Sequence, residues 1–147
     1  MARYVTTIRS PWPVEEVFEY MADARNFADW DPGVTSSKLV AGDEPGIDAA
    51  YSVSVTGATL RYVTKEYDAP RRAVLEARSF FLRSLDVIEV REVGEGCEVT
   101  YDAELELSGL LGLADPVLGL VFDRIGDRAV AGMAVALDGE IVEPVNA

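Results

Sequence analysis

The chain has 147 residues, 49% of them hydrophobic, which is enough for one domain with a sizeable core, so we expect a single domain over residues 1–147. Acidic residues outnumber basic ones 26 to 13, and the net charge of -13 repels phosphate groups, so we expect no nucleic-acid partner. The absence of histidine excludes a Ser-His-Asp or Cys-His catalytic arrangement and any metal site that needs imidazole. We therefore expect no metal and no cofactor.

The cysteine content, the N-terminal residues and the most apolar stretch of the chain bear on location. The single cysteine, Cys97, cannot form an intramolecular disulfide, which is compatible with a reducing compartment. The first residues, 1–5, lead directly into a strand-like segment without the pattern of a signal peptide. The apolar stretch 110–122 contains an aspartate and a proline and is shorter than the roughly 20 residues that span a bilayer. These features predict a cytoplasmic protein without an integral membrane segment.

The N-terminal third predicts one strand and two helices. Residues 4–9 are rich in β-branched side chains and form the first predicted strand, closed by the Ser-Pro-Trp-Pro segment at 10–13. Pro13 suits a first helical turn, and apolar residues then recur at helical spacing up to Met21. Residues 23–30 predict a second, short helix that Asp-Pro-Gly at 31–33 ends.

The rest of the chain predicts six strands and a long helix. The strands are expected at about 34–41, 49–56, 59–68, 73–81, 84–93 and 97–107. Their short links favour antiparallel neighbours, because parallel pairs need a long crossover. The helix is expected at about 115–139, with its apolar face made by Leu118, Val121, Phe122, Ile125, Ala129, Met133 and Leu137.

The clearest pattern lies in residues 97–107, where apolar or aromatic side chains occupy every odd position and polar ones every even position. Successive side chains of a strand point to opposite faces of a sheet, so this strand has one apolar and one polar face. An apolar strand face and an apolar helix face have to cover each other. The order strand, two helices, six strands and long helix therefore predicts the α+β class: a curved antiparallel sheet of about seven strands around a long C-terminal helix, with room for an internal cavity.

Charged positions indicate which side chains face this interior, because unpaired charges are costly to bury. The inward residues predicted in this way are Tyr51, Val53, Val55, Tyr62, Thr64, Glu66, Leu75, Ala77, Ser79, Phe81, Asp86, Ile88 and Val90, together with Tyr101 from the last strand. The resulting surface is apolar with a few hydrogen-bonding groups, as is usual in ligand sites. The alternative is that the same residues fill an ordinary core.

Three segments resemble one known group of proteins. They are Tyr4–Asp23 with Trp30, the strand-turn-strand segment Glu66–Arg72, and Gly96–Tyr101 before the long helix. The chain is similar to the SRPBCC superfamily of START-like, helix-grip proteins, in particular the polyketide cyclase/dehydrase and lipid-transport family. The resemblance covers nearly the whole chain and implies a helix-grip fold that binds a small hydrophobic molecule, such as a lipid or polyketide, between sheet and helix. It supplies no catalytic motif.

With the resemblance, we expect a ligand to contact twelve residues: Trp30, Tyr51, Val53, Tyr62, Thr64, Ser79, Phe81, Ile88, Tyr101, Phe122, Ile125 and Met133. Trp30 has the alternative of packing between the short helices and the sheet. The Gly- and Leu-rich segment 109–114 has three open interpretations: a lid, a contact in a homodimer, or core packing under the helix.

Hydrophobic ligand binding is our first functional hypothesis, because burial of apolar surface alone supplies enough binding energy. The alternative is a cyclase or dehydratase that uses carboxylate and tyrosine acid-base chemistry, with Asp86, Tyr62 and Tyr101 as its catalytic residues. A carboxyl group in an apolar pocket has a raised pKa and can act as acid or base. In a purely structural role, Asp86 would instead pair with an arginine such as Arg83.

Overall fold

The computed structural model describes residues 2–55, 58–80, 82–107 and 115–145, with the side chains of 115–120 and 143–145 left aside. The elements, in chain order, are β1 (Ala2–Ser10), α1 (Val14–Ala22), the 3-10 turn η1 (Ala24–Asn26), α2 (Phe27–Trp30), β2 (Val34–Ala41), β3 (Ala50–Val55), β4 (Ala58–Asp68), β5 (Arg72–Arg78), β6 (Leu82–Val93), β7 (Gly96–Leu107), α3 (Asp115–Ala136) and β8 (Glu140–Val145).

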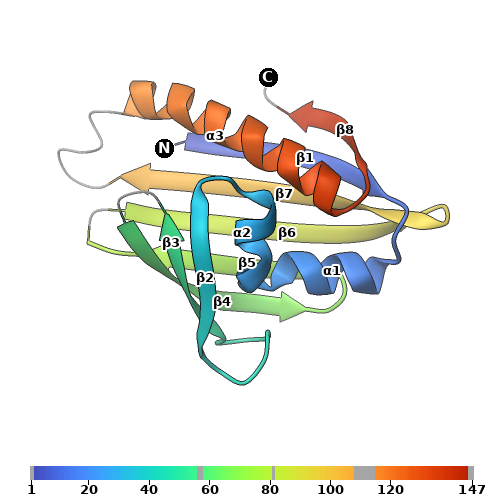
Figure 1. Cartoon of the computed structure of the whole chain (residues 1–147), viewed down its shortest axis with the longest axis horizontal. Coiled ribbons are helices and arrows are strands. Elements are labelled where there is room, and N and C mark those ends of the chain that lie inside the picture. Colours follow the sequence, from blue (N-terminus) through green and yellow to red (C-terminus); the bar gives the residue numbers. More distant parts are fainter. Residues whose placement is uncertain (1, 56–57, 81, 108–114, 146–147) are drawn as a thin grey trace.

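The eight strands of the described residues form one antiparallel sheet in the order β2-β3-β4-β5-β6-β7-β1-β8. The sheet is curved, since β2 and β3 run steeply across the view while β5, β6 and β7 run along it (Figure 1). All three helices lie on the same side of the sheet (Figure 1). The predicted α+β helix-grip architecture is confirmed, with one strand more than the seven expected.

The alternation in β7 places its odd residues in the core as predicted. Cys97, Val99, Tyr101 and Ala103 are buried beneath the helices. On the opposite face of the sheet, Glu98 is buried as well, because the guanidinium groups of two arginines cover it. The inward face of the last long strand therefore follows from its period of two.

Helix α3 is seated on the N-terminal part of the chain by two close backbone approaches. A Cβ at Gly126 would stand 2.3 Å from the ring of Tyr4, and a Cβ at Gly132 would stand 2.1 Å from the carbonyl oxygen of Trp30. The Tyr4 hydroxyl donates a hydrogen bond of 2.7 Å to Asp127 on the same helix. Only glycine permits both contacts, so the helix from 126 onward is held close to β1 and α2.

Two predictions about facing or element limits were wrong, and one strand was not predicted. Glu66 is exposed and bonds to Arg72, because a register shift between Thr64 and Glu66 turns the following residues over. β5 ends at Arg78 instead of continuing to 81, since Ser79 starts the turn into β6. The chain after α3 adds β8 along β1, a strand that the sequence pattern did not indicate.

The apolar face predicted for the long helix is only partly buried. Ala129, Met133 and Leu137 are in the core, as expected, but Val121 and Ile125 are 48% and 45% exposed. The turn before Gly126 is left partly uncovered on this face, although Phe122 still packs against the core. The Leu118 side chain lies outside the described residues, and so do Phe81 and the whole of segment 109–114 with its three interpretations.

Candidate functional site

Two buried side chains of the central sheet meet beneath α3. Asp86 on β6 stands opposite Ala103 on β7, so Tyr101, two residues along β7, is its diagonal neighbour on the same face. The Tyr101 hydroxyl donates a hydrogen bond of 2.7 Å to Asp86 Oδ2, and both residues are buried. Asp86 does not pair with Arg83, whose guanidinium lies 2.7 Å from Glu76 on the other face.

A second hydrogen-bonded pair lies beside the first. Tyr62 on β4 stands opposite Ala77 on β5, and Ala77 stands opposite Ser84 on β6. The small alanine between them lets the Tyr62 hydroxyl reach Ser84 Oγ, with the two oxygens 2.9 Å apart. The hydroxyl groups of Tyr62 and Tyr101 therefore form hydrogen bonds inside the protein rather than with solvent.

A further carboxyl group faces the same space and was missed by the sequence analysis. Asp31 follows α2, and its Oδ1 accepts a hydrogen bond of 2.9 Å from the backbone N–H of Gly33. An Asp side chain that accepts a hydrogen bond from the backbone two residues later is common in Asp-Pro-Gly turns. The sequence therefore indicated the end of a helix at Asp31 and no functional site. No local signal places the Asp31 carboxyl near Asp86, because the two residues come together only when α2 packs over the sheet.

These groups line a cavity of about 90 Å³, here called the inner cavity. Its described walls are Phe27, Asp31, Val34, Val53, Val55, Tyr62, Ser84, Asp86, Tyr101, Ala103 and Phe122. A second cavity of about 50 Å³ shares Asp31, Tyr101, Ala103 and Phe122 with it and continues along α3 to Val130. An outer hollow of about 180 Å³ follows, lined by Asp31, Pro32, Gly33, Ile125 and Arg128. Asp31 is common to all three, so it stands between the interior and the surface.

Burial dominates the acid-base properties of the site. It raises the pKa of the Asp86 carboxyl from 3.8 to about 7; the hydrogen bond from Tyr101 opposes this rise, and the charges of Asp31 and Asp102 add to it. Burial also raises the pKa of Asp31, against the bond from the Gly33 N–H. The pKa values of Tyr62 and Tyr101 are raised well above 10, mainly by burial. Near pH 7 the cavity therefore holds neutral tyrosines and an aspartate that can take either protonation state.

The structure gathers part of the predicted ligand-contact set. Val53, Tyr62, Tyr101 and Phe122 line the inner cavity together with Asp86, and Ile125 lines the two outward spaces. Others are buried in the core without lining these spaces: Tyr51, Thr64, Ile88 and Met133.

Two more predicted contact residues lie to one side of the cavities. Trp30 packs edge-on against Tyr101, with ring centroids 5.3 Å apart, and so stands behind the cavity wall. Ser79 accepts a hydrogen bond from the backbone of Leu82 in the β5–β6 turn. Neither side chain lines the three spaces, so their predicted ligand contacts receive no support from the geometry.

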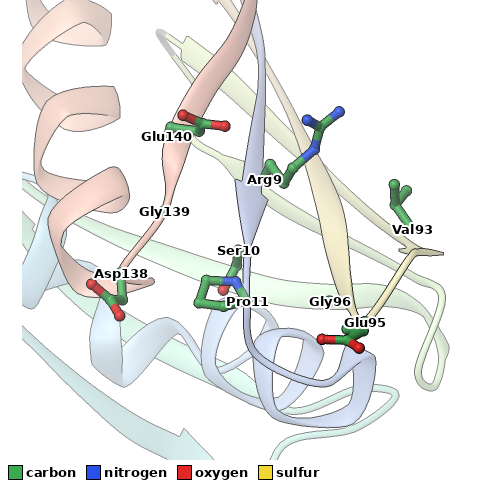
Figure 2. A pocket seen from close by; sticks show the side chains of 9 residues that line it. All are labelled: Arg9, Ser10, Pro11, Val93, Glu95, Gly96, Asp138, Gly139 and Glu140. Carbon is green, nitrogen blue, oxygen red and sulfur yellow. The ribbon is translucent and has the colours of Figure 1, made fainter.

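Larger hollows lie on the outside of the molecule. One of about 460 Å³ lies where the end of β1, the β6–β7 turn and the α3–β8 turn meet (Figure 2). The backbone of both turns lies against the end of β1 there, since a Cβ at Gly96 or Gly139 would stand within 2.3 Å of a β1 carbonyl oxygen. Another, of about 520 Å³, lies on the outer face of the sheet among paired arginines and carboxylates. These are open junctions, and neither contains a buried ionisable group, so the inner cavity is the stronger candidate.

Within the described residues, no three carboxylate or thiol groups converge as a metal-ligand set. In the same part of the chain, no helix combines the length and apolar character needed to cross a membrane.

The fold and the cavity together define a helix-grip protein with an internal space between sheet and C-terminal helix. Residues 1–138 match the family described as polyketide cyclase / dehydrase and lipid transport, and the chain belongs to this family. No curated protein sequence matches the chain.

Several solved structures share the fold at low sequence identity. The protein XoxI from Bacillus cereus has a TM-score of 0.70 at 18% identity, over 93% of this chain and 96% of that one. Ara h 8.0201 has a TM-score of 0.64 at 14% identity, over 92% and 97%. A conserved protein from Geobacillus kaustophilus has a TM-score of 0.65 at 15% identity, over 92% and 95%. At these identities the likeness establishes the fold alone.

Proposed function

We propose that this protein binds a compact, mainly apolar small molecule in the inner and second cavities. The observation that carries the proposal is the buried Asp86–Tyr101 pair, which faces a space walled by aromatic and aliphatic side chains. Apolar walls with a few fixed hydrogen-bonding groups are the usual composition of a ligand site. Membership of a family associated with polyketides and lipid transport supports the same function.

The size of the space favours a compact ligand over a long lipid chain. Cavities of about 90 and 50 Å³ are smaller than the roughly 300–1,000 Å³ typical of sites for drug-sized molecules. A guest that buries about 200 Å² of apolar surface gains about 5 kcal/mol at ~25 cal/mol/Å², before the cost of association. We therefore expect dissociation constants in the high-micromolar to millimolar range unless hydrogen bonds add to this.

Solution NMR is suited to binding this weak. In a titration of the ¹⁵N-labelled protein with small aromatic alcohols and ketones, we expect shifts in the amides of residues 31, 33, 34, 84–86 and 101–103. Phe122→Trp should fill the boundary between the two cavities and abolish these shifts. Val135→Trp is the control, since Val135 lies on the same helix and is 82% exposed. Shifts confined to the outer surface, or unchanged in the folded Phe122→Trp variant, would overturn the proposal.

A second candidate is acid-base catalysis of the cyclase or dehydratase type. It is favoured by Asp86, whose pKa of about 7 suits a general acid or base near neutral pH. Tyr101, and Tyr62 beyond it, would position the reacting carbonyl or hydroxyl. The experiment is to assay Asp86→Asn with a polyketide-like substrate: loss of turnover with unchanged affinity supports catalysis, whereas a wild type without turnover leaves binding alone.

Further aspects follow from the composition and remain predictions. We propose one domain over residues 1–147, a cytoplasmic location and no nucleic-acid partner. Analytical ultracentrifugation tests whether the protein forms a homodimer.

A further inference from the structure

Two acidic side chains line the inner cavity without a positively charged partner. Asp86 is 3% exposed, and Asp31 faces the same space. Among the residues that the structure describes, no arginine or lysine lies within ion-pair distance of either carboxyl. Their hydrogen bonds come from the neutral Tyr101 hydroxyl and the Gly33 N–H. A charge buried in this way is costly unless a cation balances it.

Two largely buried carboxylates on the other face of the sheet, unlike Asp86, form ion pairs with arginines. The Glu98 side chain is 5% exposed and is held by Arg9 and Arg91. The Glu76 side chain is 12% exposed and is held by Arg83 and Arg78. These paired carboxylates have lowered pKa values, mainly through the hydrogen bonds from their arginines. Among the described residues, Asp86 differs in being a buried carboxyl group without an arginine, and the half-buried Asp31 beside it has none either.

The cavity walls supply a second feature that suits a cation. Four aromatic rings line the inner cavity together with the two carboxyl groups: those of Phe27, Tyr62, Tyr101 and Phe122. The faces of aromatic rings attract cations, the more so when water is excluded. An acidic protein with a net charge of -13 also attracts cations over longer distances.

We propose that the ligand of this cavity carries a protonated amine, with its ammonium group between Asp31 and Asp86 and its apolar part along Phe122 towards Ile125. This inference rests on the proposed function, because it requires that a ligand enters the cavity. It adds the chemical class of that ligand: a compact, monocationic amine with an apolar body.

The other ionisable groups around the site are compatible with this arrangement. Tyr62 from β4 and Tyr101 from β7 remain neutral at pH 7 because burial raises their pKa values. Asp102 from β7 adds negative charge from the outer face, where it pairs with Arg3. Arg128 of α3 lines the outer hollow and is exposed, so solvent screens its repulsion of an ammonium group in the inner cavity.

Benzylamine, benzyl alcohol and benzoate form a matched set of probes, since they share one ring and differ in charge. A cavity of about 150 Å³ accommodates benzene, and the two adjoining cavities of about 90 and 50 Å³ together offer similar room. Binding would be measured by NMR titration of the full chain at pH 7.5. We expect benzylamine to bind at least tenfold more tightly than benzyl alcohol, and benzoate more weakly than both.

Two variants assign the effect to the cavity. Asp86→Asn keeps the shape and a hydrogen-bonding group, so it should lower benzylamine affinity at least tenfold while leaving benzyl alcohol affinity unchanged. Asp31→Asn should act in the same direction. The control is Glu106→Gln, which removes one negative charge at an exposed position of β7 outside the cavity and should leave all three affinities unchanged.

The pH dependence gives an independent measurement. A carboxyl with a pKa of about 7 is about one-tenth ionised at pH 6 and nine-tenths at pH 8. Wild-type affinity for benzylamine should therefore rise about tenfold between these pH values, and the rise should disappear in Asp86→Asn.

The outcomes separate this inference from the proposed function. If benzyl alcohol binds in the cavity as tightly as benzylamine, or if Asp86→Asn leaves benzylamine affinity unchanged, the inference is overturned while ligand binding stands. If none of the three probes shifts the cavity amides, both fail.

Discussion

Replacing Asp86 by Asn should stabilise the protein at pH 8 and have little effect at pH 4. Asp86 is 3% exposed and has no arginine or lysine partner within the described residues. Ionising it inside the protein is therefore unfavourable, whereas the unfolded chain ionises it in water without penalty. An asparagine has nearly the same shape, is never charged, and can still accept the hydrogen bond from Tyr101.

The size of the effect follows from the two pKa values. The pKa of Asp86 rises from 3.8 in the unfolded chain to about 7 in the folded protein, a difference of about three pKa units. At 1.36 kcal/mol per unit, the ionised carboxyl lowers the free energy of unfolding by about 4 kcal/mol. The folded state holds the proton more tightly, so stability is lost as pH rises from about 4 to about 7 and is constant above that.

Urea unfolding of wild type and Asp86→Asn at five pH values from 4 to 8 would measure this difference. With a slope of about 2 kcal/mol/M, the variant midpoint should lie about 2 M higher at pH 8 and coincide with wild type near pH 4. Glu106→Gln serves as the control for loss of one negative charge and should follow the wild type. Equal midpoints of wild type and Asp86→Asn throughout this range would refute our account of the site.

Three further predictions test the surroundings of the site. Tyr101→Phe removes the hydrogen bond that opposes the effect of burial, so the pKa of Asp86 should rise above 7 in a ¹³C-carboxyl NMR titration; a fall would contradict this. Gly132→Ala places a Cβ 2.1 Å from the Trp30 carbonyl oxygen and should cost about 3 kcal/mol in urea unfolding, and an unchanged midpoint would show that α3 is not held there. Glu98→Gln should lower the melting temperature more at pH 7 than at pH 3, because the pKa of Glu98 is lowered and its contribution is lost progressively as pH falls below 4.5 and the carboxylate is protonated; equal losses at both pH values would argue against the ion pairs.

The site could be predicted from the sequence only in part. The alternation of charged and apolar residues in β6 and β7 predicted that Asp86 and Tyr101 face inward. The structure places both side chains in the wall of one cavity. The same reasoning failed at Glu66, because a bulge in β4 shifts the facing by one residue. A period of two holds only while the register is regular, and no local pattern marks where it breaks.

The sequence by itself determined the α+β class, the positions of seven strands and the long helix, and the inward face of most strands. These features depend on local periodicity and on short links, which are properties of neighbouring residues. The tertiary structure alone decided that β8 pairs with β1, that Ile125 is left partly exposed, and that Asp31 joins Asp86 at one cavity. Those outcomes depend on how closely α2 and α3 approach the curved sheet, and contacts between residues far apart in the chain set that distance.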